Sequence, residues 1–121
     1  MTDAPDLTGR SILVVEDDYY LASDTAAALR GAGAAILGPC PSEDATFALL
    51  ATERPTHAVL DLNLGGGGPR FAIAEALQAL GVPFLFLTGY DPEVIPPAMA
   101  GVPRLQKPVS PATVAEAVAR L

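Results

Sequence analysis

Short apolar runs alternate with helical patterns along most of the chain. The runs are rich in Val, Ile, Leu and Phe, which is typical of strands that a parallel sheet buries on both faces. The fifth run is the most polar and suits an edge position. These runs predict five strands, at Ser11–Glu16, Ala34–Gly38, His57–Asp61, Pro83–Leu87 and Val102–Gln106.

Apolar residues at helical spacing fill the gaps between these strands. Ser42 and Ser110 suit N-caps, and Pro69 suits a first helical turn. The spacing predicts helices from about Asp18 to Ala32, from Ser42 to Glu53, from Pro69 to Gly81 and from Ser110 to Leu121.

A fourth helix is expected between the fourth and fifth strands, in the segment 91–101. This segment contains Pro92, Pro96 and Pro97. A proline inside a helix removes a backbone donor and clashes with the preceding turn. We therefore expect the fourth helix to be short, broken or mobile.

The alternation predicts an α/β fold, a doubly wound five-stranded parallel sheet with helices on both faces. In the flavodoxin-like strand order 2-1-3-4-5, the crevice lies beyond the C-terminal ends of the first and third strands. Residues 1–9 are predicted to be a flexible N-terminal lead-in, and residues 10–121 a single domain.

The amino-acid composition argues against several classes of function. The 121 residues carry 14 acidic and 7 basic side chains, a net charge of −7, which argues against direct binding to nucleic acid. A lone cysteine, Cys40, excludes an intramolecular disulfide framework. The sequence has no apolar run of about 20 residues and no signal-like start, so we expect a cytoplasmic protein without membrane contact.

Polar residues follow the predicted strands where each one ends. Glu16 and Asp17 follow the first strand, Asp61 ends the third, Thr88 follows the fourth and Lys107 follows the fifth. Each alone is more often a turn, cap or surface residue, but parallel strands bring their ends to one edge. Crowded carboxylates favour a hard divalent cation, and Mg²⁺ suits such a set. The set predicts phosphoryl transfer to Asp61.

Four segments in this order resemble the receiver domain of two-component response regulators. The resemblance covers nearly the whole chain and rests on LVVEDD at 13–18, LDLNL at 60–64, FLTGY at 86–90 and QKP at 106–108. The run DLNLGGGG, the FLTGY segment and the proline-rich 91–101 region look like the FATGUY subgroup of receivers. We interpret the glycines at 65–68 as a flexible loop after Asp61.

The resemblance implies a role for each matching residue. Asp61 is then the phosphoacceptor, and Glu16 and Asp17 are the acidic pair, with Asp17 the more direct ligand of Mg²⁺ (or Mn²⁺). Asn63 offers its backbone carbonyl to the metal. The resemblance also implies that Thr88 carries the switch hydroxyl and that Lys107, with a cis bond to Pro108, neutralises charge on the phosphoryl group. Gly89 is then the small residue that keeps the phosphoryl pocket open. Asn63 and Tyr90 are the residues that tune the phosphoaspartate lifetime.

As a receiver, the chain accepts a phosphoryl group from a histidine kinase or a histidine phosphotransfer protein. It assists its own phosphorylation and dephosphorylation and is not an enzyme in the ordinary sense. The signal is expected at the surface of the fourth helix, fifth strand and last helix. Arg104 stands where receivers usually carry Tyr or Phe. Our hypothesis is that order and disorder in Asp91–Gly101 replaces the aromatic swing.

Two other hypotheses for the function remain. A phosphorylation-independent pseudo-receiver would act as a protein-interaction module, although its expected loss of the acids or the lysine is missing. A small flavodoxin-like enzyme or flavin binder is a third reading, but the acidic loop EDDYY at 16–20 suits a flavin phosphate poorly. The sequence does not separate a stand-alone regulator from a piece of a longer protein.

Overall fold

The computed structural model describes residues 4–65 and 67–121, so Gly66 of the predicted glycine loop lies outside the described residues. A parallel five-stranded sheet with the order β2-β1-β3-β4-β5 forms the centre of the fold, which confirms the predicted fold class and strand order. The strands are β1 (Ser11–Val15), β2 (Ala35–Cys40), β3 (His57–Asp61), β4 (Phe84–Thr88) and β5 (Arg104–Gln106).

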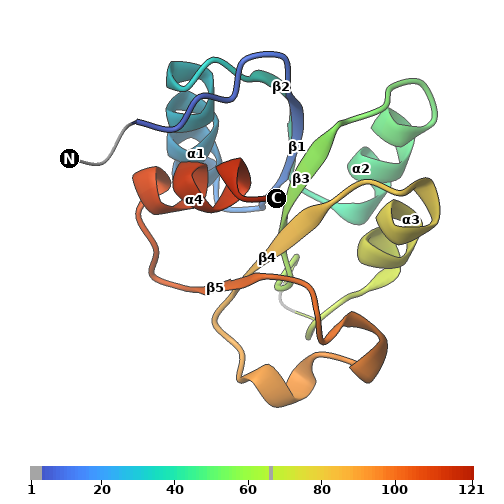
Figure 1. Cartoon of the computed structure of the whole chain (residues 1–121). Helices are drawn as coiled ribbons and strands as arrows, with labels where there is room; N and C mark the ends of the chain where they lie inside the picture. Colours follow the sequence, from blue (N-terminus) through green and yellow to red (C-terminus); the bar gives the residue numbers. More distant parts are fainter. Residues whose placement is uncertain (1–3, 66) are drawn as a thin grey trace.

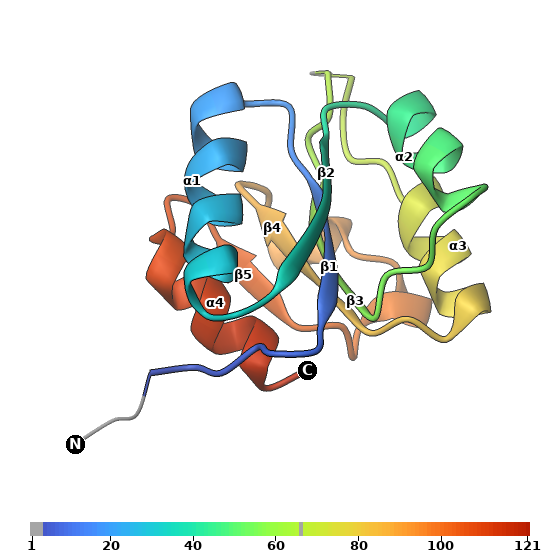
Figure 2. The ribbon, with the colours of Figure 1, turned by 90° about the horizontal axis from the view of Figure 1, so that it is seen from above.

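Helices cover both faces of the sheet (Figure 2). α1 and α4 lie together on one face, and α2 and α3 lie on the other (Figure 1). Asp18, Ser42 and Ser110 cap three of the helices, each through a side-chain oxygen that accepts a backbone N–H. The helices are α1 (Tyr19–Gly31), α2 (Glu43–Leu50), α3 (Ala72–Leu80) and α4 (Pro111–Ala119).

Two apolar cores follow from the alternation of side chains along the strands. Leu13 and Val15 of β1 pack in the core that includes Leu77 of α3. Their neighbours Ile12 and Val14 pack in the opposite core, beneath α1 and α4. The central strands β1, β3 and β4 are therefore apolar on both faces, and the polar side chains at their C-terminal ends are an exception.

Several boundaries differ from the prediction, for example the start of β5, which lies at Arg104 rather than Val102. β2 continues to Cys40 because the pairing with β1 shifts between Leu13 and Val15, where Gly38 adopts a φ of +92°. α2 ends at Leu50 rather than near Glu53. α3 begins at Ala72, so the prediction that Pro69 lies in its first turn is wrong. The N–H of Arg70 is donated to the carbonyl of Leu62 instead, which keeps this stretch in a closed loop.

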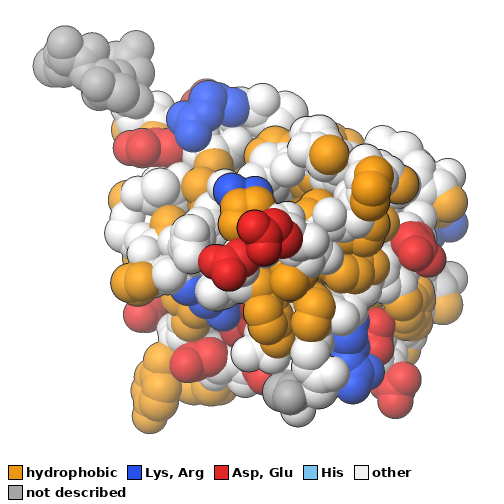
Figure 3. Space-filling model, turned by 90° about the horizontal axis from the view of Figure 1, so that it is seen from below, with side chains coloured by type: hydrophobic (Ala, Val, Ile, Leu, Met, Phe, Trp, Pro, Cys, Tyr) orange, Lys and Arg blue, Asp and Glu red, His pale blue; other side chains and the backbone are white. Residues whose placement is uncertain are grey.

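The predicted fourth helix is replaced by two short 3₁₀ turns, η1 (Pro92–Val94) and η2 (Pro97–Met99), which confirms a broken element. These turns lie at the bottom of the view in Figure 1. Seen from below, hydrophobic side chains gather on this face, with acidic side chains among them (Figure 3). Half-buried Ile95 and exposed Glu93 belong to this segment.

The first part of the chain packs against the domain from Leu7 onward. Leu7 is fully buried, and its N–H is donated to the carbonyl of Ala32 after α1. Residues 1–3 of the predicted lead-in lie outside the described residues. Within the described part of the chain, no helix has the length and apolar character needed to cross a membrane.

Candidate functional site

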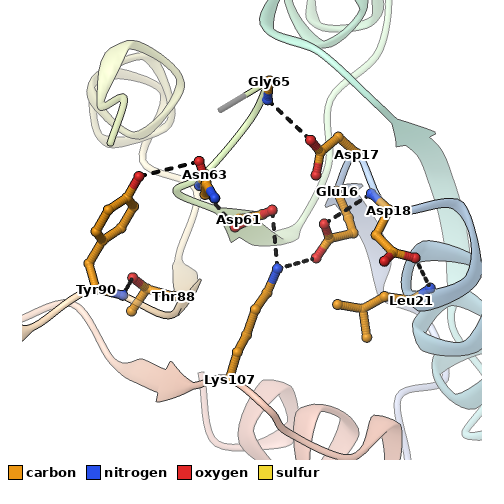
Figure 4. Close-up of polar contacts among 10 residues, drawn as sticks. All are labelled: Glu16, Asp17, Asp18, Leu21, Asp61, Asn63, Gly65, Thr88, Tyr90 and Lys107. Carbon is orange, nitrogen blue, oxygen red and sulfur yellow. Dashed lines mark hydrogen bonds and ion pairs between the residues drawn. The ribbon is translucent and has the colours of Figure 1, made fainter. Parts of the chain in front are cut away.

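The polar residues at the strand ends converge on one edge of the sheet. Glu16 and Asp17 follow β1, Asp61 ends β3, Thr88 ends β4 and Lys107 follows β5. Because all five strands are parallel, their C-terminal ends meet at this edge, and the side chains lie around a common centre (Figure 4).

Lys107 joins two buried carboxylates. Its Nζ lies 2.9 Å from Oε1 of Glu16 and 3.2 Å from Oδ2 of Asp61. Glu16 is 2% exposed and Asp61 is 4% exposed, so neither carboxylate has bulk water to solvate it. Buried charges of this kind persist only when opposite charges or hydrogen-bond donors accompany them.

This crowding changes the proton affinity of two of the groups. Burial raises the pKa of Glu16 to about 7, and the neighbouring Asp61 adds to the effect while Lys107 opposes it. Burial alone would lower the pKa of Lys107, but its contacts with Glu16 and Asp61 outweigh burial and raise that pKa above the usual value. The ammonium therefore stays charged, whereas Glu16 titrates near neutral pH.

Asp17 differs from its neighbour Glu16 because it is exposed to solvent. Its Oδ2 accepts the N–H of Gly65 over 3.1 Å. Partial burial acts to raise the pKa of Asp17, but the Gly65 hydrogen bond and other contacts outweigh it, and the net effect is a lowered pKa. Asp17 is thus an ionised carboxylate at the mouth of the site.

The carboxylates fit a divalent cation. One oxygen from each of Glu16, Asp17 and Asp61 lies within 4.8 Å of the others. Oε1 of Glu16 and Oδ2 of Asp61 are buried, and among the described residues neither has a hydrogen-bond partner of good geometry beyond the contact with Lys107. Carboxylate oxygens are hard donors of the kind that such cations bind.

Among the other predicted residues, Asn63 contacts Asp61, whereas Thr88 bonds with the chain after β4 (Figure 4). The N–H of Asn63 is donated to Oδ1 of Asp61 over 2.9 Å, and the N–H of Tyr90 is donated to Oγ1 of Thr88 over 2.8 Å. A Cβ added to Gly89 would meet no atom within 4 Å, so the space beside it is open. The peptide bond from Lys107 to Pro108 is cis.

No family model matches the sequence, and no curated protein matches it. Solved structures do match. The response regulator PhyR from Brucella abortus is 23% identical over 95% of this chain and 48% of that chain, with a TM-score of 0.79. The receiver (REC) domain of PhyR from Erythrobacter litoralis is 22% identical over 93% of this chain and 89% of that domain, also with a TM-score of 0.79. The fold is that of a receiver domain.

A third structure with a similar fold contains bound ligands. The response regulator from Burkholderia pseudomallei, with a phosphorylated aspartic acid, a calcium ion and citrate, is 24% identical over 90% of this chain and 66% of that chain, with a TM-score of 0.71. The present chain spans about half the length of the Brucella PhyR chain.

Three contacts around these residues were not predicted from the sequence. Tyr90 donates its hydroxyl to Oδ1 of Asn63 over 3.3 Å, and Gly65 reaches Asp17 from the loop after β3. An ion pair between Arg70 and Glu43 ties the same loop to α2. The glycine run at 65–68 was the only sequence signal for these contacts, because it marks a loop whose backbone can approach other groups closely.

Proposed function

We propose that this chain is a receiver that accepts a phosphoryl group on Asp61. The observation that carries the proposal is the environment of this carboxylate. It is buried, it lies 3.2 Å from the ammonium of Lys107, and it shares a cation-sized space with the carboxylates of Glu16 and Asp17. A reactive carboxylate beside fixed positive charge is the arrangement that phosphoryl transfer needs.

In the proposed reaction, a carboxylate oxygen of Asp61 attacks the phosphorus of a phosphohistidine. An oxygen–phosphorus bond forms, the phosphorus–nitrogen bond breaks, and the imidazole leaves with the electron pair. Lys107 neutralises negative charge on the transferred oxygens, and the hydroxyl of Thr88 donates to one of them. In dephosphorylation, water attacks the same phosphorus, the bond between phosphorus and the Asp61 oxygen breaks, and inorganic phosphate leaves with the carboxylate restored. The chain therefore assists its own reactions and turns over no separate substrate.

Glu16, Asp17 and Asp61 would hold Mg²⁺, or Mn²⁺ in its place, together with the backbone carbonyl of Asn63. The bound ion would supply positive charge beside the incoming phosphoryl group. This assignment is supported by the donor set, which consists of oxygen ligands only, and by the two buried carboxylate oxygens described above.

The phosphodonor is proposed to be a histidine kinase or a histidine phosphotransfer protein in the cytoplasm. A net charge of −7 favours protein partners over nucleic acid. The Asp61 carboxylate lies at the C-terminal edge of the sheet beneath exposed Asp17 and Gly65, and a partner's histidine side chain would approach from that edge.

Signalling is proposed to follow the FATGUY pattern, through the segment Asp91–Gly101. Oγ1 of Thr88 accepts the N–H of Tyr90, so a turn of Thr88 toward a phosphoryl group releases that N–H at the start of the segment. Arg104 on β5 is exposed and is not an aromatic side chain, which leaves the two 3₁₀ turns as the element that responds.

Incubation with acetyl phosphate and Mg²⁺, followed by intact-mass measurement, tests the proposal. The wild type should gain the mass of one phosphoryl group, and Asp61→Asn should gain none. Asp24→Asn, which removes an exposed carboxylate on α1, is the matched control and should behave as the wild type. A wild type that gains no mass and forms no beryllofluoride complex would instead indicate the pseudo-receiver.

A further inference from the structure

The loop between β3 and α3, residues 62–71, contacts the chain after β1 and the start of α2, in addition to the contacts of Leu62 and Asn63 with β4 and the chain after it. The N–H of Gly65 donates a hydrogen bond to the Asp17 carboxylate, which follows β1. Nη1 of Arg70 donates one to Oε1 of Glu43, at the start of α2, over 2.8 Å. From residue 64 to residue 70, among the described residues, these are the two hydrogen bonds that leave the loop. Figure 4 shows the Gly65 end of this arrangement.

Glycine makes this loop costly to hold in one conformation. Gly65 and Gly68 have φ angles of +74° and +95°, and glycine loses more backbone freedom on ordering than any other residue. A loop of this composition positions a single N–H reliably only when further contacts restrain it. Arg70 lines the same hollow as Gly65, beside the start of α2, so a restraint at Arg70 acts close to Gly65.

Arg70 contacts both α2 and the loop backbone. A Cβ added to Gly67 would lie 3.1 Å from Nη2 of Arg70, so the guanidinium packs directly against the loop. The N–H of Arg70 is donated to the carbonyl of the buried Leu62, which closes the base of the loop. The ion pair with Glu43 spans a hollow of about 210 Å³ between the loop and the start of α2.

We propose that Arg70 and Glu43 are positioning residues for the metal ligand Asp17. Their ion pair restrains the loop so that the Gly65 N–H holds the Asp17 carboxylate in one orientation. A ligand that is already oriented loses less freedom when a cation binds, so the ion pair increases affinity for Mg²⁺. This inference rests on the proposed function, because the cation site is part of that proposal.

A purely electrostatic effect of the two side chains predicts a different change in Mg²⁺ affinity from a positioning effect, so the two can be distinguished. By charge alone, removing the positive charge of Arg70 would strengthen cation binding, whereas removing the negative charge of Glu43 would weaken it. Loss of the ion pair weakens binding in both cases. Arg70→Gln and Glu43→Gln therefore separate the two effects by sign.

The experiment measures Mg²⁺ affinity by calorimetry and amide exchange of Gly65 by NMR in the metal-free protein. Arg70→Gln and Glu43→Gln should each weaken Mg²⁺ binding by about two- to fivefold, the range of a partly exposed ion pair. Both should accelerate Gly65 exchange. The charge swap of Arg70→Glu with Glu43→Arg should restore both values toward those of the wild type, and Arg120→Gln, at an exposed position after α4, should change neither.

Opposite shifts in affinity for the two single variants, or unchanged Gly65 exchange, would overturn the positioning role. A swap that fails to restore binding while the protein stays folded would do the same. These results differ from a failure of the proposed function, in which the wild type itself binds no Mg²⁺ and gains no phosphoryl group.

Discussion

The hydroxyl of Tyr90 donates a hydrogen bond to Oδ1 of Asn63 over 3.3 Å and thereby joins the chain after β4 to the chain after β3. The N–H of Asn63 is donated to Asp61, so the contact places the Tyr90 side chain beside the proposed phosphoacceptor (Figure 4). The ring packs against the same core as the half-buried Ile95, which belongs to the segment with the two 3₁₀ turns.

Tyr90→Phe removes this hydrogen bond and keeps the ring. We expect the phosphorylated protein to lose its phosphoryl group about two- to fivefold faster, because a freed Asn63 side chain leaves the attacking water better access; one hydrogen bond of roughly 1 kcal/mol sets this scale. Intact-mass measurements during decay give the rate. Tyr20→Phe, at a residue 78% exposed on α1, is the control, and equal decay in both variants would refute the role of the contact.

Glu16 predicts how stability depends on pH when no metal is present. Burial raises the pKa of Glu16 from 4.5 to about 7, so the native state binds more protons than the unfolded chain between these values. The contribution of Glu16 to the free energy of unfolding should therefore be greatest below about pH 4.5. This contribution should be lost as pH rises through 7.

Thermal unfolding in a chelator, compared between the wild type and Glu16→Gln, measures this contribution. The wild type should lose melting temperature relative to the variant as pH rises, and saturating Mg²⁺ should remove the loss because the cation replaces the proton. Burial lowers the pKa of His57, which adds a slope of opposite sign to both proteins and cancels in the comparison. Parallel profiles for the two proteins would contradict the prediction.

Lys107→Met should separate cation binding from phosphoryl uptake. Without the ammonium, Glu16 and Asp61 hold a cation with less competition, so Mg²⁺ affinity should rise. Uptake from acetyl phosphate should fall by roughly 100-fold, because a preplaced positive charge is lost from the transferring oxygens. Arg120→Met is the control. If affinity and uptake fall together, Lys107 acts on the fold rather than on the reaction.

The segment Asp91–Gly101 should change its backbone exchange when the protein is phosphorylated. Thr88 links the site to this segment through the N–H of Tyr90, and the two 3₁₀ turns contain few backbone hydrogen bonds to hold them. Hydrogen exchange read by mass spectrometry, with and without acetyl phosphate, measures the change. Thr88→Ala should still take up the phosphoryl group but show a smaller response, and a segment that exchanges identically in both states would exclude this route.

The sheet was predictable because buried parallel strands require continuous apolar sequence, as in the runs around Val14 and Val59. The broken fourth helix followed from the chemistry of proline. The start of α3 did not follow from Pro69, because a tertiary contact between Arg70 and Leu62 decided it. The extension of β2 likewise depends on a register shift opposite Gly38, which only the pairing with β1 reveals.

The convergence of Asp61 and Lys107 followed from topology, since parallel strands end at the same edge. The contacts between loops did not. The hydrogen bonds from Tyr90 to Asn63 and from Gly65 to Asp17 join residues 27 and 48 positions apart. Periodicity carries no information about how two loops meet, so these contacts required the three-dimensional structure.

Identification of the modified residue tests directly whether Asp61 accepts a phosphoryl group with the help of a divalent cation. The protein is treated with acetyl phosphate with and without Mg²⁺, the acyl phosphate is reduced with borohydride, and the peptides are identified by mass. Asp61 alone should be reduced, and only in the presence of Mg²⁺. Reduction at another carboxylate, or at Asp61 to the same extent without the metal, would contradict this prediction.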